Sequence, residues 1–173
     1  MTIADFTLLI LRLVVGLTFA GHGAQKAFGW WNGPGPEKWR GAIAAMHFQP
    51  VWLWSTLSIA AELGGGLLLA IGLLTPLAAT LLIGQSVVIT LKVHLPNGFW
   101  NSNRGVEFGL ALGAGTVAIL GIGPGFISVD HVIGFALSQP LLWLLLIVGI
   151  VGGIASYGVS LLAPAPQPVA EHR

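Results

Sequence analysis

The chain has 173 residues, of which 55% are hydrophobic and only 8% are charged, and its formal net charge is +1. Soluble domains carry roughly 25% charged residues, so this composition and the mean hydropathy of +0.87 exclude an ordinary water-facing surface and indicate a membrane protein. The small net charge gives no basic surface for nucleic acid. Cysteine is absent, which excludes disulfides, thiolate nucleophiles and cysteine-bound zinc or iron–sulfur clusters in this chain. Redox chemistry here would need a bound cofactor, a substrate or a partner.

Five apolar segments are long enough to cross a bilayer as helices, which takes about 20 residues. They are residues 6–27, 51–73, 76–95, 104–123 and 140–162. Pro76 and Pro140 stand at the starts of the third and fifth segments, where a helix does not need the missing N–H. The turn between the second and third segments is so short that these helices must be antiparallel neighbours. The sequence therefore predicts an all-α membrane protein built as a helix bundle.

The remaining segments are predicted to be connections and a tail. Residues 37–47 follow Pro36 and could form a short interfacial helix, and residues 96–103 form a second loop on the same side. The tail, residues 163–173, is rich in proline and is predicted to be disordered.

Five spans place the two termini on opposite faces, and the basic residues gather on one of them. They are Lys26, Lys38, Arg40, Lys92, Arg104 and Arg173. Because cytoplasmic loops carry the excess of Lys and Arg, we expect the C-terminus to be cytoplasmic and the protein to lie in the plasma (inner) membrane. Six of the seven tryptophans share the basic side. They form either an interfacial aromatic belt or an aromatic cap over a site built by the two long loops.

Ionisable residues inside the apolar segments are the main functional candidates, since a charge in hydrocarbon is costly unless it is paired or hydrated. From the helical rise, Arg12 lies roughly 20 Å and Glu62 about 16 Å from the basic side, so these two are expected to pair near the midplane. Lys92 and Glu107 each lie within about 6 Å of the basic side and form a second expected pair. His22, Lys26, His94 and Arg104 lie at or above that level.

Helical spacing predicts which faces point inward. Asp5, Arg12, Phe19 and Lys26 recur every seven residues on the first helix, with Gly16 and Gly23 between them. On the second helix one face holds Ser55, Ser58, Glu62, Gly65 and Gly66, and small residues of this kind let helices approach closely. The fifth segment has no such polar stripe and is expected to be a peripheral support.

A purely structural role remains an alternative for these charges, because buried ion pairs can fix the register of helices. The two histidines His22 and His94 do not make a convincing metal site without cysteine or carboxylates at ligand spacing, so neither a metal nor a haem is expected.

Several motifs resemble the DoxX family of small bacterial membrane proteins. They are LRLVVGLTFAGHGAQK from Leu11, AELGGGLLLAIGLLTP from Ala61, VEFGL from Val106, and GIGPGFISVDH ending at His131. The resemblance spans about residues 6–135 and implies a four-helix transmembrane domain over residues 1–135, to which residues 136–162 add a fifth transmembrane helix. The family is related to a membrane subunit of thiosulfate:quinone oxidoreductase, which implies a quinone-linked redox role together with other membrane or redox subunits.

Three functions compete at this point. Under the redox hypothesis a quinone is the cofactor, Glu62, Lys92, His94 and Glu107 serve catalysis, and Arg12, His22, Lys26, Trp100 and Arg104 bind the quinone. The second hypothesis is a transporter for a small molecule or anion, which needs polar residues through the whole thickness. The third is a structural scaffold subunit. The small-residue faces also permit, without requiring, a homo-oligomer.

Overall fold

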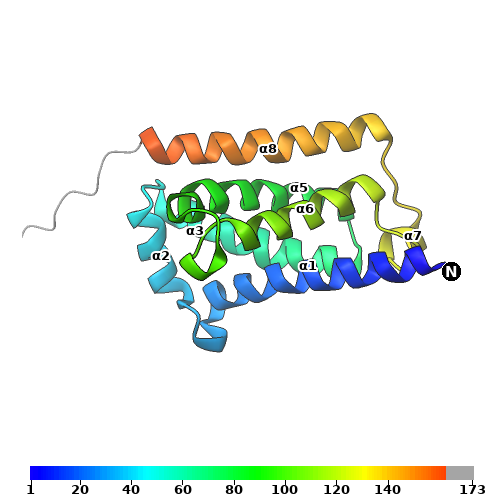
Figure 1. Cartoon of the computed structure of the whole chain (residues 1–173), viewed down its shortest axis with the longest axis horizontal. Helices are drawn as coiled ribbons and strands as arrows, with labels where there is room; N and C mark the ends of the chain where they lie inside the picture. The colour runs from blue at the N-terminus through cyan, green and yellow to red at the C-terminus, as the bar shows by residue number, and fades with distance from the viewer. Residues whose placement is uncertain (163–173) are drawn as a thin grey trace, which may run out of the picture.

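The computed structural model describes residues 1–162 and shows a bundle of long helices with a short helix lying across each end (Figure 1). The helices are α1 (Ile3–Phe28), α2 (Gly35–Ala45), α3 (Val51–Ile59), α4 (Gly66–Ile71), α5 (Thr75–Ile89), α6 (Glu107–Ile122), α7 (Val129–Ile133) and α8 (Gln139–Leu162). The π-helical turn η2 (Ala60–Gly65) joins α3 to α4, and a second one, η3 (Thr90–His94), continues α5. The short 3-10 turns η1 (Trp30–Asn32), η4 (Leu95–Asn97) and η5 (Asn101–Asn103) lie in the connections. The all-α prediction is confirmed, whereas the predicted tail lies outside the described residues.

Four continuous helical stretches are long and apolar enough to cross a membrane: Ile3–Phe28, Val51–Ile71, Thr75–Asn97 and Gln139–Leu162. The chain is therefore a multi-pass membrane protein. The other predicted span corresponds to α6, whose 16 residues extend only about 24 Å, so the count of five spans stays a prediction. The N-terminus and the end of α8 lie at opposite ends of the bundle (Figure 1).

The two ends of the bundle differ in what they carry. The end formed by α2, η3 and the C-terminal ends of α1 and α8 holds most of the basic residues and is called the basic end below. The opposite end is formed by α7, the start of α1 and the turn between α4 and α5, and is called the α7 end. The predicted interfacial helix is confirmed as α2, which begins two residues earlier than expected and ends at Ala45.

Small residues hold α1 against η2 and α4. A Cβ atom placed on Gly16 would lie 2.6 Å from the carbonyl oxygen of Gly66, and one on Gly66 would lie 2.5 Å from the backbone nitrogen of Ala20. A Cβ on Gly23 would meet the backbone of Leu63 in the same way. This contact sets Leu63 opposite Gly23, so Glu62 lies level with the last turn of α1. The predicted inward faces of the first two helices are confirmed, since both sets of glycines and Glu62 are buried.

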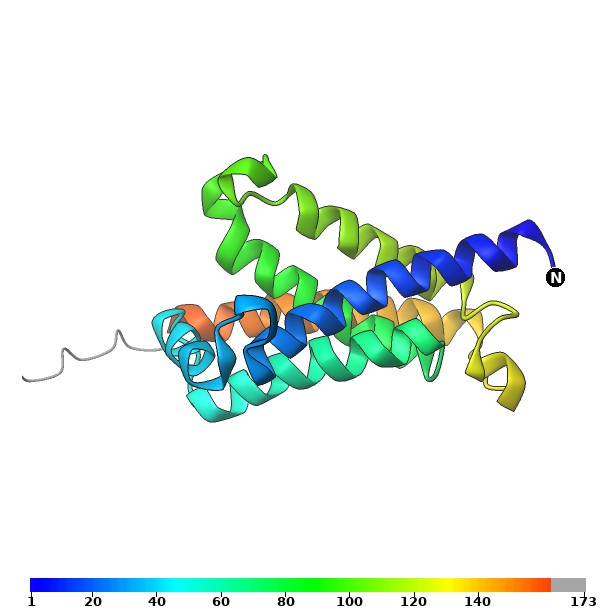
Figure 2. The ribbon, with the colours of Figure 1, turned by 90° about the horizontal axis from the view of Figure 1, so that it is seen from below.

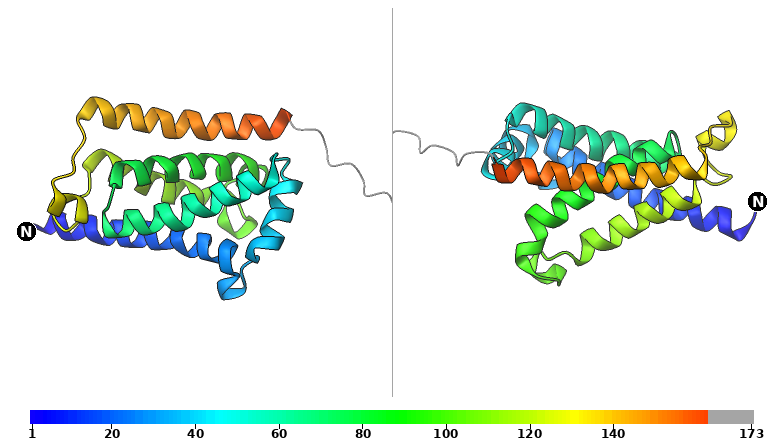
Figure 3. Two further views of the ribbon diagram at one scale, coloured as in Figure 1. Left: turned by 180° about the vertical axis from the view of Figure 1, so that it is seen from behind. Right: turned by 90° about the horizontal axis from the view of Figure 1, so that it is seen from above.

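The helix α8 packs along α5 through glycines as well (Figure 3). A Cβ on Gly153 would lie 2.7 Å from the carbonyl oxygen of Gly84, and one on Gly149 would lie 2.9 Å from that of Thr80. Between the two ends of the bundle the core is apolar, built from side chains such as Val15, Phe19, Leu69, Leu82 and Ile119.

The glycine contact between α1 and α4 can be tested by substituting two glycines that lie close together in the sequence. Gly66→Ala should force the two backbones apart and lower the free energy of unfolding by about 1–3 kcal/mol, the range for an overpacked core. Gly64→Ala is the matched control, because a Cβ there meets nothing within 4 Å. Thermal unfolding of the two variants in detergent measures the difference, and equal stability would contradict the proposed packing.

Candidate functional site

A buried ion pair joins α1 to η2 at the basic end. Lys26 Nζ lies 2.5 Å from Glu62 Oε1, and the two residues are 9% and 1% exposed. The expected pairing of Arg12 with Glu62 is wrong. That expectation counted depth from the helix ends, but α3 begins well beyond the end of α1, so Glu62 lies level with Lys26 and not with Arg12.

Three further side chains contact the pair: Ser58, Gln85 and Trp39. We call these three residues, together with Lys26 and Glu62, the Lys26 cluster. Gln85 on α5 donates from Nε2 to Glu62 Oε1 at 2.9 Å and to Ser58 Oγ at 3.0 Å. Lys26 Nζ lies 3.5 Å from the same hydroxyl and 4.0 Å from the centre of the Trp39 ring. Charge-assisted hydrogen bonds and a cation–π contact are the interactions that make a buried charge tolerable. The cluster therefore ties α1, α2, α3, η2 and α5 together at one point.

The local backbone around Glu62 is unusual. Residues Ala60–Gly65 form a π-helical turn inside an otherwise α-helical span. Such turns insert an extra residue into the helix and occur frequently at functional sites. Two atoms of the cluster, Glu62 Oε2 and Trp39 Nε1, are buried and have no hydrogen-bond partner within residues 1–162. Of these two residues Trp39 also lines the cavity described next, whereas Glu62 does not.

A cavity of about 340 Å³ adjoins this cluster. Its walls come from α2, α3, η2, α5, η3 and α8, and most of the side chains are apolar, including Ile43, Phe48, Leu57, Leu81 and Val148. The polar groups on the walls are few: Trp39, Ser58, Gln85, Thr80, Ser156 and Lys92. Apolar walls, a small number of polar groups and a volume of this order are typical of small-molecule sites.

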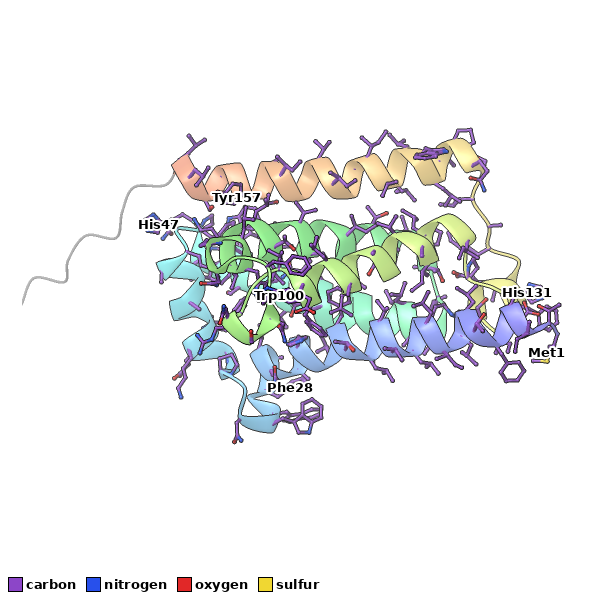
Figure 4. The ribbon with its side chains drawn as sticks, viewed as in Figure 1. Met1, Phe28, His47, Trp100, His131 and Tyr157 are labelled. Atoms are coloured by element: carbon purple, nitrogen blue, oxygen red, sulfur yellow. The ribbon has the colours of Figure 1, made fainter. Side chains whose placement is uncertain are left out.

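Lys92 belongs to this cavity, and its expected pairing with Glu107 is wrong. Its Nζ lies 5.9 Å from the ring of Tyr157, which stands on the bundle-facing side of α8 (Figure 4). Glu107 is exposed, and its Oε2 accepts a hydrogen bond from the backbone N–H of Asn101 at 2.9 Å. The two side chains point in different directions. Lys92 faces α8, whereas Glu107, at the start of α6, faces the loop that precedes it.

The other predicted site residues at this end lie away from the cavity. The connection from η3 to η5 stands apart from α2 and from the ends of α3 and α8 (Figure 2). Within it His94 Nδ1 lies 2.6 Å from the carbonyl oxygen of Arg104, and Trp100 and Arg104 are exposed. His22 is exposed on α1 and packs edge-on to Phe108 with ring centres 6.4 Å apart. The structure therefore brings Lys26, Glu62 and Lys92 to the site, and leaves His22, His94, Trp100, Arg104 and Glu107 outside it.

The tryptophans divide between the two interpretations. Trp39 and Trp54 line the cavity, as an aromatic cap requires. Trp30, Trp31, Trp52 and Trp100 are exposed, as an interfacial belt requires.

At the α7 end, Asp130 holds the turn between α4 and α5. It is 0% exposed, and its two oxygens accept hydrogen bonds from the backbone N–H groups of Leu74 at 2.7 Å and Thr75 at 2.8 Å. Its own N–H donates to the carbonyl oxygen of Gly72 at 2.8 Å. Asp130 thus caps the N-terminus of α5 from another part of the chain.

Arg12 joins the same region, 1% exposed, and donates from Nη2 to the carbonyl oxygen of Ile127. The structure places it far from the cavity. Sequence reasoning missed Asp130 as a key residue, although it lies in the Gly-Pro-Gly and Ser-Val-Asp motif that resembles the family. No group of three or more His, Cys, Asp and Glu side chains suited to a metal ion occurs among residues 1–162.

The capping role of Asp130 predicts that even a substitution of similar shape lowers the free energy of unfolding. Asp130→Asn keeps the shape but turns an amide NH₂ toward one of the two backbone donors, so we expect a loss of about 1.5–3 kcal/mol, the value of a hydrogen bond to a charged group. The control is Glu37→Gln, an exposed carboxylate in the first turn of α2. If thermal unfolding shows the two variants to be equally stable, Asp130 does not cap α5.

The Lys26–Glu62 pair predicts strong effects of breaking it. Glu62→Gln leaves Lys26 charged and buried, and should cost about 3–5 kcal/mol. Glu107→Gln removes an exposed carboxylate and should cost less than about 1 kcal/mol. Adding Lys26→Met to Glu62→Gln should recover much of the lost stability in the same unfolding measurement. A double variant less stable than Glu62→Gln would contradict the pairing.

Comparison with known proteins agrees with the sequence motifs. The family model named DoxX matches residues 7–95, about half of the chain, which includes α1, η2 and the Lys26–Glu62 pair. No curated protein and no solved structure matched the chain. The matched segment carries the close helix packing, the π-helical turn and the buried cluster, and the chain belongs to the DoxX family.

Proposed function

We propose that this protein is the membrane subunit of a redox system and binds a quinone in the cavity beside the Lys26 cluster. One observation carries the proposal: a largely apolar cavity of about 340 Å³ adjoins a buried, hydrogen-bonded ion pair inside a membrane bundle. Intramembrane charges beside a cavity mark functional sites by default.

The residues on the cavity walls suit a quinone, which is a flat apolar ring with two carbonyl oxygens. Two groups on the walls offer N–H donors: the indole of Trp39, which is buried and has no hydrogen-bond partner within residues 1–162, and the ammonium of Lys92. Apolar side chains of α2, α3, α5 and α8 would enclose the ring. When bound, a quinone supplies the acceptor for two electrons and two protons.

The chain's own groups have distinct parts in this proposal. The positive charge of Lys92 favours negative charge developing on a bound oxygen. Gln85 and Ser58 lie between the cavity and the Lys26–Glu62 pair, and this pair can hold a proton close to the quinone ring. The hydrogen bond from Gln85 fixes the orientation of the Glu62 carboxylate. The electrons would come from a substrate or from a partner subunit, because this chain has no cysteine to bind an iron–sulfur cluster.

The two alternative functions are less well supported. A transporter needs polar groups along the whole path, but the described core between the Lys26 cluster and Asp130 is apolar. The buried hydroxyls of Thr80 and Thr116 donate to carbonyl oxygens of their own helices. A scaffold needs the ion pair only for register, and does not explain why a cavity lined by the unpartnered indole N–H of Trp39 adjoins it.

Binding of a soluble quinone analogue tests the proposal. At a concentration about 100 times its dissociation constant it should stabilise the wild-type protein by roughly 2.7 kcal/mol. Trp39→Phe, which keeps a ring but removes the N–H donor, and Lys92→Met should each reduce the gain in melting temperature. Lys38→Met is the matched control, because Lys38 is exposed on α2 outside the cavity.

The scaffold alternative gives the opposite result in the same experiment. If no quinone raises the melting temperature of the wild-type protein, the quinone proposal fails. If Trp39→Phe and Lys92→Met respond like Lys38→Met, the quinone binds elsewhere.

We also propose that the basic end faces the cytoplasm and that the protein resides in the plasma membrane. The positive-inside rule supports this orientation, because Lys38 and Arg40 on α2 lie at the same end as Arg104. A reporter domain fused after Arg173 should read cytoplasmic. An extracytoplasmic reading would reverse the orientation and place the cavity at the outer face.

A further inference from the structure

The cavity is bounded by two helices that pack on different neighbours. On one side α3 packs against α2 and η2, and on the other α8 packs along α5. Residues of α5 form the floor between them. Four of the lining side chains are also among the exposed large hydrophobic residues, namely Leu57, Leu81, Val93 and Val148. The cavity is thus a groove that opens on the side of the bundle, toward the bilayer.

Apolar side chains line the whole groove, and most of its few polar groups lie toward one end. Trp39, Gln85, Lys92 and Ser156 lie toward the basic end. Toward the middle of the bundle the lining consists of residues such as Ala61, Leu81 and Val148, together with Thr80, whose hydroxyl already donates to the carbonyl oxygen of Pro76 at 2.8 Å. A ligand that fits this gradient has a polar head and a hydrocarbon extension.

Glycines of α8 keep the wall of this groove smooth. Gly149 and Gly153 are in close contact with α5, so their lack of a side chain is needed for helix packing. Gly152 also lines the cavity, but a Cβ placed there meets nothing within 4 Å. The lack of a side chain at Gly152 therefore leaves space in the groove, although helix packing does not require a glycine there.

We propose that α8 and α3 form a side channel for the isoprenoid tail of a membrane-borne quinone, with Gly152 on its wall. The inference rests on the proposed function and goes beyond it: the ligand is a long-tailed quinone that reaches the site sideways from the bilayer. The helix α8 lies outside the residues that the family model matches, so the C-terminal helix sets the preference for the tail. Under this proposal the fifth helix has a part in binding beyond that of a peripheral support.

The test compares three ligands on three proteins. The ligands are a long-tailed quinone, the same ring without a tail, and an isoprenoid alcohol that has the tail without the ring. The proteins are the wild type, Gly152→Leu and Gly158→Leu. Gly158 is the matched control, since it lies on the same helix, has open space around its Cβ position and does not line the cavity. Dissociation constants of the two quinones in lipid nanodiscs follow from quenching of tryptophan fluorescence. The alcohol does not quench, so its dissociation constant follows from displacement of the long-tailed quinone. Thermal unfolding verifies that each variant is folded.

The expected result separates tail from ring. Gly152→Leu should weaken binding of the long-tailed quinone about tenfold or more, the effect of filling an apolar subsite, and should leave the tail-less quinone unchanged. Gly158→Leu should alter neither, and Gly152→Ala should have a smaller effect than Gly152→Leu.

Other outcomes would overturn the inference in distinguishable ways. Equal weakening of both quinones by Gly152→Leu, or no weakening of either, would show that the tail does not follow α8. Failure of both Gly152 variants to fold would contradict the open space beside Gly152. If the alcohol binds as tightly as the long-tailed quinone and the tail-less ring does not bind, the tail channel stands and the quinone function fails. If none of the three binds to the wild type, both proposals are wrong.

Discussion

The buried ion pair between Lys26 and Glu62 is the interaction on which the basic end of the molecule depends. Two charges inside a membrane bundle are tolerated only when each has partners of high quality. Close contact of α1 with η2 and α4, made possible by glycines, brings the pair together at 2.5 Å. Gln85 from α5 and Trp39 from α2 then complete the surroundings. Four of the elements that converge on the cluster, α2, α3, η2 and α5, also form walls of the cavity, which η3 and α8 complete.

The α7 end also contains a buried charge that needs partners, the carboxylate of Asp130. Both oxygens of the Asp130 carboxylate accept hydrogen bonds from backbone N–H groups, and these bonds stabilise the turn between α4 and α5. At the basic end, by contrast, only one oxygen of the Glu62 carboxylate has hydrogen-bond partners among the described residues, and the neighbouring Trp39, Ser58 and Gln85 line a cavity. Unpartnered buried atoms alone do not distinguish the two ends, because Arg12 Nε and Nη1 at the α7 end also have no hydrogen-bond partner within residues 1–162. The difference in carboxylate pairing, together with the cavity, explains why we assign a structural role to Asp130 and a binding role to the Lys26 cluster.

Much of the fold could be predicted from the sequence, but the pairing of charges could not. Four of the five predicted spans, the prolines at helix starts, and the inward faces of the first two helices follow from hydropathy and from the 3.6-residue period. Pairing depends on how far one helix is shifted along its neighbour, and that shift is set by contacts such as Gly16 with Gly66, which no periodicity reveals. The π-helical turns that place Glu62 and Lys92 are equally invisible in a pattern of apolar residues. The wall formed by Gly152 was missed because a glycine without a packing contact gives no sequence signal.

The central claim, that Lys26 and not Arg12 is the partner of Glu62, can be measured directly in membranes. The chain has only three lysines and four glutamates, so selective labelling of lysine Nζ with ¹⁵N and of glutamate side-chain carboxyl carbons with ¹³C gives simple solid-state NMR spectra. Glu62→Gln identifies the Glu62 signal by its disappearance. We expect a strong dipolar coupling between Lys26 Nζ and the Glu62 carboxyl carbon, as a separation of 2.5 Å between Nζ and Oε1 requires. Absence of that coupling, with a coupling from Glu62 to a labelled Arg12 guanidinium in its place, would contradict the account.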